Sequence, residues 1–326
     1  MLGKAGEKIL QPCISVLWTP AATGARVLRV FGDTPCPAVP AAVAGRPVTE
    51  IGPYCFSARR EPEGGALWGP EGADGAPLHP LCGDFVQEVT LPQSVRALHN
   101  GAFYNCRRLR RVTAGPDLRE LGSDLFTNCR SLAVFCLLAA ADEPTGLKKL
   151  LAAAAGDIAA EFAPGGRVQA RMFCPEYQET LHENTPAHIF NHSIEGVGYR
   201  YRQCFAGGAV DWAEYDAAFL RADATEPPAA LCRVALGRLL FPFALGPAAR
   251  AQYEDYLRSH ADAALALAVQ ARAEAAVRLL APLAPDGCRQ AAALQCGRTG
   301  WSEGAALLLA GRAPAPRRKT YDFDDL

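Results

Sequence analysis

Apolar residues recur with a fixed period in the stretch from residue 86 to residue 135. After a shift of 23 residues, seven apolar positions of one segment meet apolar positions of the next: Val95, Leu98, Ala102, Phe103, Cys106, Leu109 and Val112 meet Leu118, Leu121, Leu125, Phe126, Cys129, Leu132 and Phe135. The pattern FxNC at 103–106 returns at 126–129. Self-similarity at a period of this length indicates a repeat architecture, in which each unit buries its apolar face against the next.

The same pattern occurs upstream, where VTEIGPYCF at 48–56 matches the start of the repeat. Residues 57–84 then interrupt the register, and they are crowded with Gly and Pro, which favour turns over helices and strands. We therefore expect an insertion that loops out of one repeat. Leu67 and Trp68 are its bulkiest apolar pair and are expected to pin it down.

Stacked coils place equivalent residues in line, because a single coil cannot bury its own apolar face. We expect a stacked spine of aromatic rings at Phe56, Phe103 and Phe126, with the Asn of each repeat at a bend. Cys106 and Cys129 fall in the same inner column. They are expected as buried thiols rather than as a disulfide or a metal pair.

The segment VTLPQSVRALHNGAFYNCRRLRRV at 89–112 combines a short strand, an LP corner and an AF..C..L run. This combination resembles the BspA-type leucine-rich repeats of bacteria, and the resemblance covers residues 36–138. It implies a β-solenoid of about three to four coils that carries the insertion at 57–84. Residues 1–35 are expected to form a capping hairpin.

The period stops after Cys136, and residues 139–225 are predicted to be a mixed linker and helical segment. EPTGLKKLLAAAAGDIAAEF at 143–162 predicts a helix that begins near Thr145. Residues 168–173 fit either a strand or a short helix.

Two further helices are predicted in this segment. Thr185 and Pro186 have the form of an N-cap followed by Pro at the first helical position, which predicts a helix over 186–192. DWAEYDAAFLRA at 211–222 places its aromatic residues at helical spacing and predicts another.

Residues 226–312 are predicted to form a helical domain. PPAALCRVALGRLLFPF has the composition of a buried helix and is expected to stop at Pro242. GPAARAQYEDYLRSHADAALALAVQ predicts two helices with a break near Ser259.

The motifs EAAVRLLA at 274–281 and EGAALLLA at 303–310 match with an offset of 29 residues. Each follows a helix and a tight turn, and such helix pairs are similar to ankyrin repeats, although the ankyrin TPLH turn is missing. A plain bundle of helical hairpins is equally consistent. The leucines expected in the interface are Leu279, Leu280, Leu308 and Leu309. The tail at 313–326 is predicted to be flexible, with a docking peptide as the alternative.

Composition limits the partners of the chain. Lys plus Arg total 33 against 34 for Asp plus Glu, and this balance argues against nucleic-acid binding through overall charge. The N-terminus lacks the form of a secretory signal, and no apolar run is long enough to predict a membrane span. Twelve cysteines occur without a CxxC motif and are expected to be reduced, in the cytoplasm.

Arginines dominate one outward column of the predicted coils. Arg96 stacks over Arg119, and like charges in that position are mildly destabilising. Other arginines of the repeats, Arg110 among them, extend the basic patch, which predicts an acidic protein partner. Nucleic acid fits less well, because no interleaved aromatic residues accompany the arginines in sequence. The predicted contact residues are Arg96, Arg110 and Arg119, with Trp68 on the insertion.

His188 and His192 are the candidate metal ligands. A His pair four residues apart on a helix can bind zinc, with a Cys or carboxylate to complete the site, but no HExxH motif is present. A zinc module or metal-dependent hydrolase is therefore the alternative, and no cofactor is expected in the main interpretation.

The chain is thus predicted to be α+β, with a short leucine-rich-repeat β-solenoid followed by stacked helix pairs. The expected function is non-enzymatic protein–protein interaction, because broad repeat surfaces bind through area and no catalytic motif is found. An exported effector or surface repeat protein is a further alternative.

Overall fold

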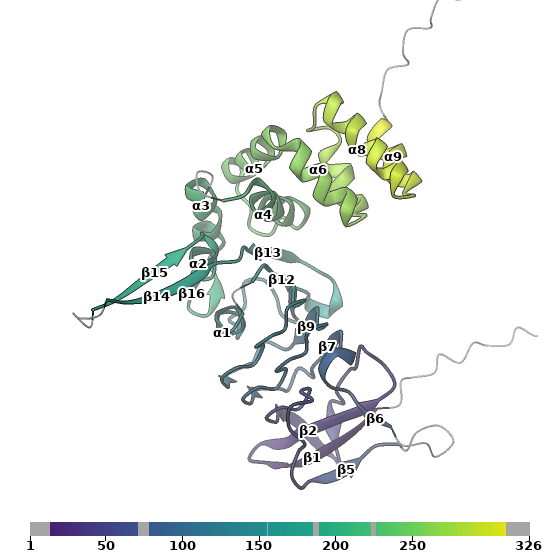
Figure 1. Cartoon of the computed structure of the whole chain (residues 1–326), viewed down its shortest axis with the longest axis vertical. Helices are drawn as coiled ribbons and strands as arrows, with labels where there is room; N and C mark the ends of the chain where they lie inside the picture. The colour runs from purple at the N-terminus through teal and green to yellow at the C-terminus, as the bar shows by residue number, and fades with distance from the viewer. Residues whose placement is uncertain (1–13, 71–77, 155, 185–188, 223–225, 311–326) are drawn as a thin grey trace, which may run out of the picture. The chain divides into compact units, whose positions relative to one another are not determined.

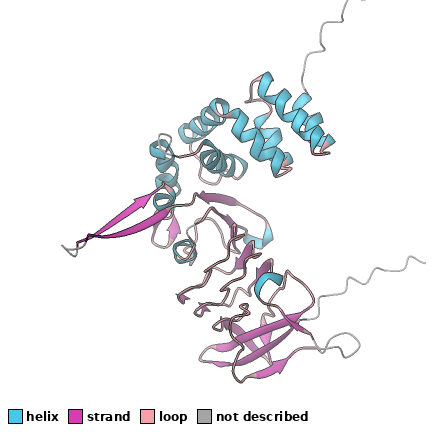
Figure 2. Ribbon diagram, viewed as in Figure 1, coloured by secondary structure: helices cyan, strands magenta, loops and turns pink. Residues whose placement is uncertain are grey.

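The structure is a computed structural model, and it describes residues 14–70, 78–154, 156–184, 189–222 and 226–310 (Figure 1). The tail predicted at 313–326 and the candidate ligand His188 lie outside these residues. Strands dominate the N-terminal part and helices the C-terminal part (Figure 2). The chain divides into two compact units, Met1–Glu226 with Phe241–Leu245, and Pro227–Leu240 with Gly246–Leu326.

The first unit contains two sheets built from the two short strands of each coil. We call the sheet with order β10-β8-β4-β2-β1-β5 the second-strand sheet. Its strands are β1 Ser15–Ala21, β2 Gly24–Gly32, β4 Arg46–Ile51, β5 Ala66–Trp68, β8 Ala97–Leu98 and β10 Glu120–Leu121, with β3 Ala42–Val43 and β6 His79–Pro80 at its margins. β1 and β2 form an antiparallel hairpin, and β2, β4, β8 and β10 then run parallel.

The other sheet, which we call the first-strand sheet, has the order β13-β12-β11-β9-β7. Its strands are β7 Glu88–Thr90, β9 Arg111–Ala114, β11 Val134–Leu137, β12 Ile158–Phe162 and β13 Ala170–Cys174. The first four are parallel, and β13 closes the sheet in antiparallel fashion. Glu88 pairs with Arg111 and Glu120 with Ala97, which is the register that the period of 23 residues predicts.

The core confirms the predicted aromatic spine. Phe56 and Phe103 are stacked with ring centroids 5.1 Å apart and an interplanar angle of 3°, and Phe103 and Phe126 follow at 5.4 Å and 15°. Phe135 extends the row by 5.2 Å from Phe126. Offset aromatic pairs gain about 1 kcal/mol beyond their burial, so the row holds successive coils in register.

The solenoid extends further than the repeat motif in both directions. β2 pairs in parallel with β4, and β12 pairs in parallel with β11. The helix predicted to begin near Thr145 within 143–162 is therefore only partly right. α1 covers Leu147–Ala152, but Ile158–Phe162 form the strand β12. The alanines of β12 favour a helix by propensity, but Ile158, Ala160 and Phe162 are buried at the two-residue period of a strand.

The helix predicted over 186–192 is also wrong. β15 begins at Ile189 and pairs with β14 over seven residue pairs, Gln178–Asn184 against Ile189–Glu195. Cross-strand pairing thus overrides the local cap signature of Thr185 and Pro186 in the part of the segment that the structure describes. Of the two options for residues 168–173, the strand is correct, as β13 shows.

The remaining elements of this unit are short except for one helix. α3 spans Trp212–Ala222 and confirms the helix predicted from aromatic spacing. The others are η2 Gly83–Phe85, η3 Pro164–Gly166, α2 Gly198–Tyr201, β16 Phe205–Ala206 and β17 Ala209–Val210.

The second unit is helical, as predicted. Its helices are α4 Pro228–Leu240, α5 Pro247–Ser259, α6 Ala261–Gln270, α7 Glu274–Leu280, α8 Asp286–Arg298 and α9 Ser302–Leu309. The predicted stop near Pro242 and break near Ser259 are confirmed. Leu280 and Leu308 are buried, whereas Leu279 is half-buried and Leu309 is exposed, so only one leucine of each predicted pair lies fully in the core.

The hairpins α6–α7 and α8–α9 turn in the same way. Arg272 and Gly300 both have left-handed backbone, with φ values of 47° and 66°. The next residues, Ala273 and Trp301, donate backbone hydrogen bonds of 2.9 Å to carbonyls five positions back. Both turns therefore carry the Schellman motif that ends a helix.

Candidate protein-binding surface

Arg96 and Arg119 occupy equivalent positions in successive coils, one residue before β8 and β10 of the second-strand sheet. The backbone amide of Arg96 donates to the carbonyl of Thr49, and that of Arg119 donates to the carbonyl of Arg96, both over 2.8 Å. Arg96 and Arg119 are exposed. We call these two residues the arginine column.

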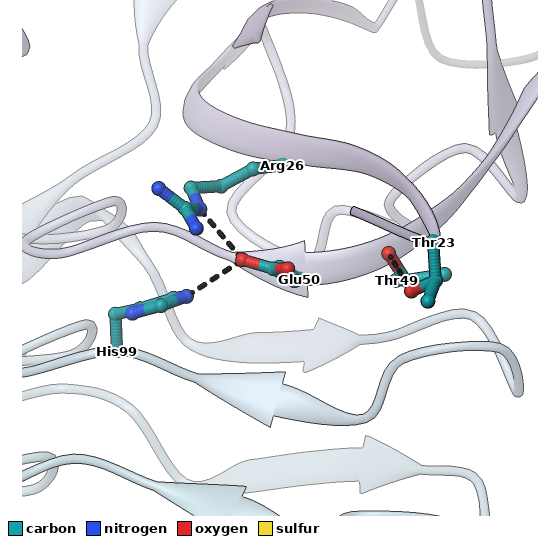
Figure 3. Close-up of polar contacts among 5 residues, drawn as sticks. All are labelled: Thr23, Arg26, Thr49, Glu50 and His99. Atoms are coloured by element: carbon teal, nitrogen blue, oxygen red, sulfur yellow. Dashed lines mark hydrogen bonds and ion pairs between the residues drawn. The ribbon is translucent and has the colours of Figure 1, made fainter. Parts of the chain in front are cut away.

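Next to the arginine column, the carboxylate of Glu50 is held by two side chains from neighbouring coils, Arg26 and His99 (Figure 3). Glu50 accepts a hydrogen bond of 2.6 Å from Arg26 Nε and lies 2.8 Å from His99 Nε2. Burial raises the pKa of Glu50, but the hydrogen bonds from His99 and Arg26 outweigh it, so the pKa is lowered from its ordinary value. The charge of Glu50 is therefore engaged by these partners.

A surface hollow lies beside the arginine column. It is lined by Ala97, Leu98, His99, Asn100, Arg119, Glu120, Leu121, Gly122 and Lys149. Ala97 stands between Glu50 and Glu120 in the strand ladder, so a small side chain forms part of its floor. Gly122 is required, because a Cβ there would lie 2.3 Å from Asn100 Oδ1.

The cations at this hollow are weakly neutralised. Arg119 lies 3.6 Å from Asp117, and both side chains are at least half exposed, so the pair contributes little. Lys149 of α1 donates to the backbone carbonyl of Arg119. Arg119 and Lys149 thus border one hollow from different elements.

The other two predicted contact residues lie elsewhere. Arg110 precedes β9 of the first-strand sheet and donates to Gln87 Oε1 in the preceding coil. Trp68 is on β5, at the opposite end of the second-strand sheet from β8, with β4, β2 and β1 between them. The four predicted residues therefore do not form one surface.

The insertion is held at the residues predicted to pin it, Leu67 and Trp68, but through their backbone in β5 and not through buried side chains. Leu67 and Trp68 are exposed by 67% and 37%. Instead, β5 pairs with β1 and β6 pairs with β2 through the backbone. The fully buried Arg29 also donates to the carbonyls of Ser57, over 2.6 Å, and of Arg60. Every residue has a backbone carbonyl, so the sequence could not predict that Arg29 would bind those of Ser57 and Arg60.

Glu88 stands opposite Arg111 in the register that the period of 23 residues predicts, but Arg111 forms its ion pair with another carboxylate. Arg111 lies 2.8 Å from Glu161 on β12, and Arg171 on β13 binds the other oxygen of that carboxylate. Burial raises the pKa of Glu161, but the charges and hydrogen bonds of Arg171 and Arg111 outweigh it and lower the pKa. A buried carboxylate between two arginines ties the end of the solenoid together.

The metal-ligand prediction loses its geometric basis. His192 is on β15, opposite Leu181, so the helical spacing assumed for the His pair is absent. Cys174 and Cys204 are buried, and burial raises the pKa of each to about 12, which disfavours the thiolate that a metal needs. Within the described ranges, no three His, Cys, Asp or Glu residues are grouped so as to hold a metal ion.

Comparison with known proteins supports the repeat. Residues 82–141 match the family model described as BspA type leucine rich repeat region, in six copies. The resemblance drawn from the motif at 89–112 is thus confirmed for this segment. By this comparison the solenoid has about six turns, so the predicted three to four coils are too few. Parallel strands beyond both ends of the motif are one reason that the motif alone undercounts them.

A solved structure is also similar in part. A leucine rich cell surface protein from Faecalibacterium prausnitzii A2-165 is 22% identical over 36% of this chain and 27% of that chain, with a TM-score of 0.26. The chain therefore spans about a quarter of that protein. No curated protein matches. In the portion of the chain that the structure describes, no helix has both the length and the hydropathy to cross a bilayer.

Proposed function

We propose that this chain is a non-enzymatic interaction protein that binds an acidic protein partner through the arginine column and the adjoining hollow. The observation that carries the proposal is the adjacent register of the exposed Arg96 and Arg119, for which the described residues offer only the exposed Asp117 as an ion-pair partner. Stacked like charges are mildly unfavourable in the free protein. A partner carboxylate that meets Arg96 and Arg119 together offsets that repulsion, and a second carboxylate fits the hollow between Arg119 and Lys149.

Electrostatic complementarity of this kind acts chiefly on association rate and specificity. Binding is therefore expected to weaken steeply with salt, because exposed charges are screened within about 8 Å at physiological ionic strength. The leucine-rich repeat of residues 82–141 fits this role, since repeat surfaces bind through extended area.

We further propose the cytoplasm as the compartment and an ankyrin-like stacking for α6–α7 and α8–α9. The eleven cysteines at described positions are all free thiols, in keeping with a reducing environment. The shared turn geometry at Arg272 and Gly300 supports a repeated helical hairpin.

The test begins with affinity purification of the tagged protein from its native cell and identification of the co-eluting proteins. The purified partner is then titrated against wild type, Arg96→Glu/Arg119→Glu and the control Arg167→Glu/Arg298→Glu. The control changes the net charge equally at exposed arginines outside the solenoid face. We expect about a hundredfold loss for the first variant and less than twofold for the control, because each lost close charge contact contributes about 1.4 kcal/mol. Equal affinity of the two variants would rule out this surface.

A further inference from the structure

Two tyrosines and two arginines meet at the base of the insertion, where the sequence shows no motif. Tyr54 and Tyr104 contact edge to face, with ring centroids 6.2 Å apart. The Arg59 guanidinium lies 4.8 Å above the Tyr104 ring and donates a 2.7 Å hydrogen bond to its hydroxyl. Arg60 lies 5.7 Å from the centre of the Tyr54 ring. We call these four residues, with Arg107, the insertion corner.

The insertion corner is held in place before any ligand arrives. Tyr54 has left-handed backbone with φ of 55°, and its ring lies against Gly101, where a Cβ would come within 2.6 Å of the ring. Arg29 fixes the carbonyls of Ser57 and Arg60 on either side of Arg59. Binding would therefore require little ordering of these side chains, which favours affinity.

A hollow adjoins the insertion corner. It is lined by Ala58, Arg59, Gly83, Asp84, Asn105 and Arg107. The asparagine ladder of the coils runs from Asn128 Nδ2 to Asn105 Oδ1 over 2.7 Å. No asparagine continues it at Ala58, because the chain leaves the coil there for the insertion. Asn105, Arg59 and Arg107 thus present donors, beside the Asp84 carboxylate, to a space that the described residues leave open.

The charge of this region is unbalanced. Arg59, Arg60, Arg107 and Arg108 are exposed. Among the described residues their one ion-pair partner is Asp84, 3.8 Å from Arg107, and that pair is more than half exposed on each side. An exposed pair of this length contributes little, so the four arginines leave a net positive surface.

We propose that the insertion corner is a second docking site, which takes an acidic segment of a protein partner and seats one carboxylate in the hollow. Tyr and Arg are the residues most enriched where binding energy concentrates in protein interfaces. The guanidinium groups of Arg59 and Arg60 lie over the tyrosine rings, so those ring faces are not open to stacked bases as in single-strand binders. The site lies at the bends of the coils and does not rest on the arginine column.

The probe is a fluorescein-labelled peptide of six glutamates around one phenylalanine, measured by anisotropy against the full chain. The same peptide with glutamines is the neutral control, and an eight-residue oligothymidylate tests the nucleic-acid outcome. The variants are Arg59→Glu, Ala58→Asn, Tyr104→Phe, Arg96→Glu/Arg119→Glu and the control Arg167→Glu. Thermal melts accompany each variant, so that loss of binding is compared only among folded proteins.

We expect the acidic peptide to bind wild type at least tenfold more tightly than either control ligand. Arg59→Glu should weaken binding about tenfold through lost charge. Ala58→Asn should do the same without any charge change, because the amide fills the hollow. Tyr104→Phe, which keeps the ring and frees Arg59, should weaken it about threefold. The column variant and Arg167→Glu should retain binding.

The proposal is overturned if Arg59→Glu and Ala58→Asn both bind like wild type. It is also overturned if the oligothymidylate binds more tightly than the peptide with the same dependence on these residues, which would assign the site to nucleic acid. Loss of peptide binding only in the column variant would overturn this site while supporting the arginine column.

Discussion

The thiol of Cys129 donates a hydrogen bond of 3.0 Å to the backbone carbonyl of Phe103, one coil earlier. Cys106 makes the same contact with Phe56, also over 3.0 Å. Each of these cysteines is therefore both a wholly or partly buried side chain and a second donor to a carbonyl that already accepts a backbone N–H, from Gly83 at Phe56 and from Cys106 at Phe103. This dual role explains why Phe and Cys recur together.

Cys106→Ala is expected to lower the free energy of unfolding by about 1–2 kcal/mol, because the Phe56 carbonyl keeps only its 2.8 Å hydrogen bond from the Gly83 amide and a small cavity opens. Cys129→Ala should cost less, since Cys129 is only half-buried whereas Cys106 is fully buried. Urea unfolding of both variants at one pH measures the difference. An equal or reversed order would contradict the role given to burial.

Thiol reactivity should separate the cysteines sharply. Burial raises the pKa of Cys55 and Cys129 to about 12, so at pH 8 their thiolate fraction is about 10⁻⁴. Among the cysteines that the structure describes, Cys36 is exposed and should react first with a thiol reagent in the native protein. After denaturation all twelve cysteines should react if the protein is isolated reduced. A shortfall after denaturation would contradict the cytoplasmic proposal.

Phe103→Ala should be among the most destabilising substitutions in the solenoid. Phe103 is fully buried and stacks on both Phe56 and Phe126, so the expected loss is about 3–5 kcal/mol. Phe103→Leu keeps most of the volume and should cost about 1 kcal/mol. Chemical unfolding gives both values, and similar losses would show that stacking in register is unimportant.

At the asparagines of the bends, substitution by glycine should destabilise the protein less than substitution by alanine. Asn128 has φ of 63° and donates from its side chain to Asn105. Asn128→Ala loses the hydrogen bond and strains the backbone, whereas Asn128→Gly loses only the hydrogen bond. The alanine variant should therefore be less stable than the glycine variant by about 1 kcal/mol. The reverse order in thermal unfolding would exclude a backbone origin.

Glu161→Gln should destabilise the protein by about 3 kcal/mol at pH 7, because Arg111 and Arg171 lose their shared carboxylate. The folded pKa of Glu161 lies below its ordinary value of 4.5, so the unfolded state takes up this proton first as the pH falls. The stabilisation is present above pH 4.5 and is lost as the pH falls through the folded pKa. The difference in unfolding free energy between wild type and Glu161→Gln should thus narrow below pH 4.5.

Unfolding free energies between pH 7 and pH 4 test this sign. Arg167→Gln removes an exposed arginine with no ion-pair partner in the described structure and serves as the control. Its difference in unfolding free energy from wild type should stay constant with pH. If the difference in unfolding free energy between wild type and Glu161→Gln widens as the pH falls, the lowered pKa of Glu161 is contradicted.

Particular elements show where sequence reasoning succeeds. The stacking of Phe56, Phe103 and Phe126 and the register of Arg96 over Arg119 follow from a period, since identical coils must align identical residues. Helices α3 to α9 follow from helical spacing and from Pro breaks. The predicted helices over 143–162 and 186–192 failed where strand pairing outweighed local preference, with β11 of the preceding coil in the first case and with the neighbouring strand β14 in the second.

The sequence by itself determined that equal coils stack, which residues form their core, and which arginines share an outer column, because those relations repeat along the chain. Only the tertiary structure decided that Trp68 and Arg110 lie apart from that column, that Glu161 joins two arginines, and that Tyr54 meets Tyr104 beside Arg59. These contacts join residues whose separation follows no period, so nothing in the linear order specifies them. The contact of Tyr54 and Tyr104 with Arg59, for example, depends on where the insertion leaves its coil and on the hydrogen bonds of the buried Arg29 to the carbonyls of Ser57 and Arg60.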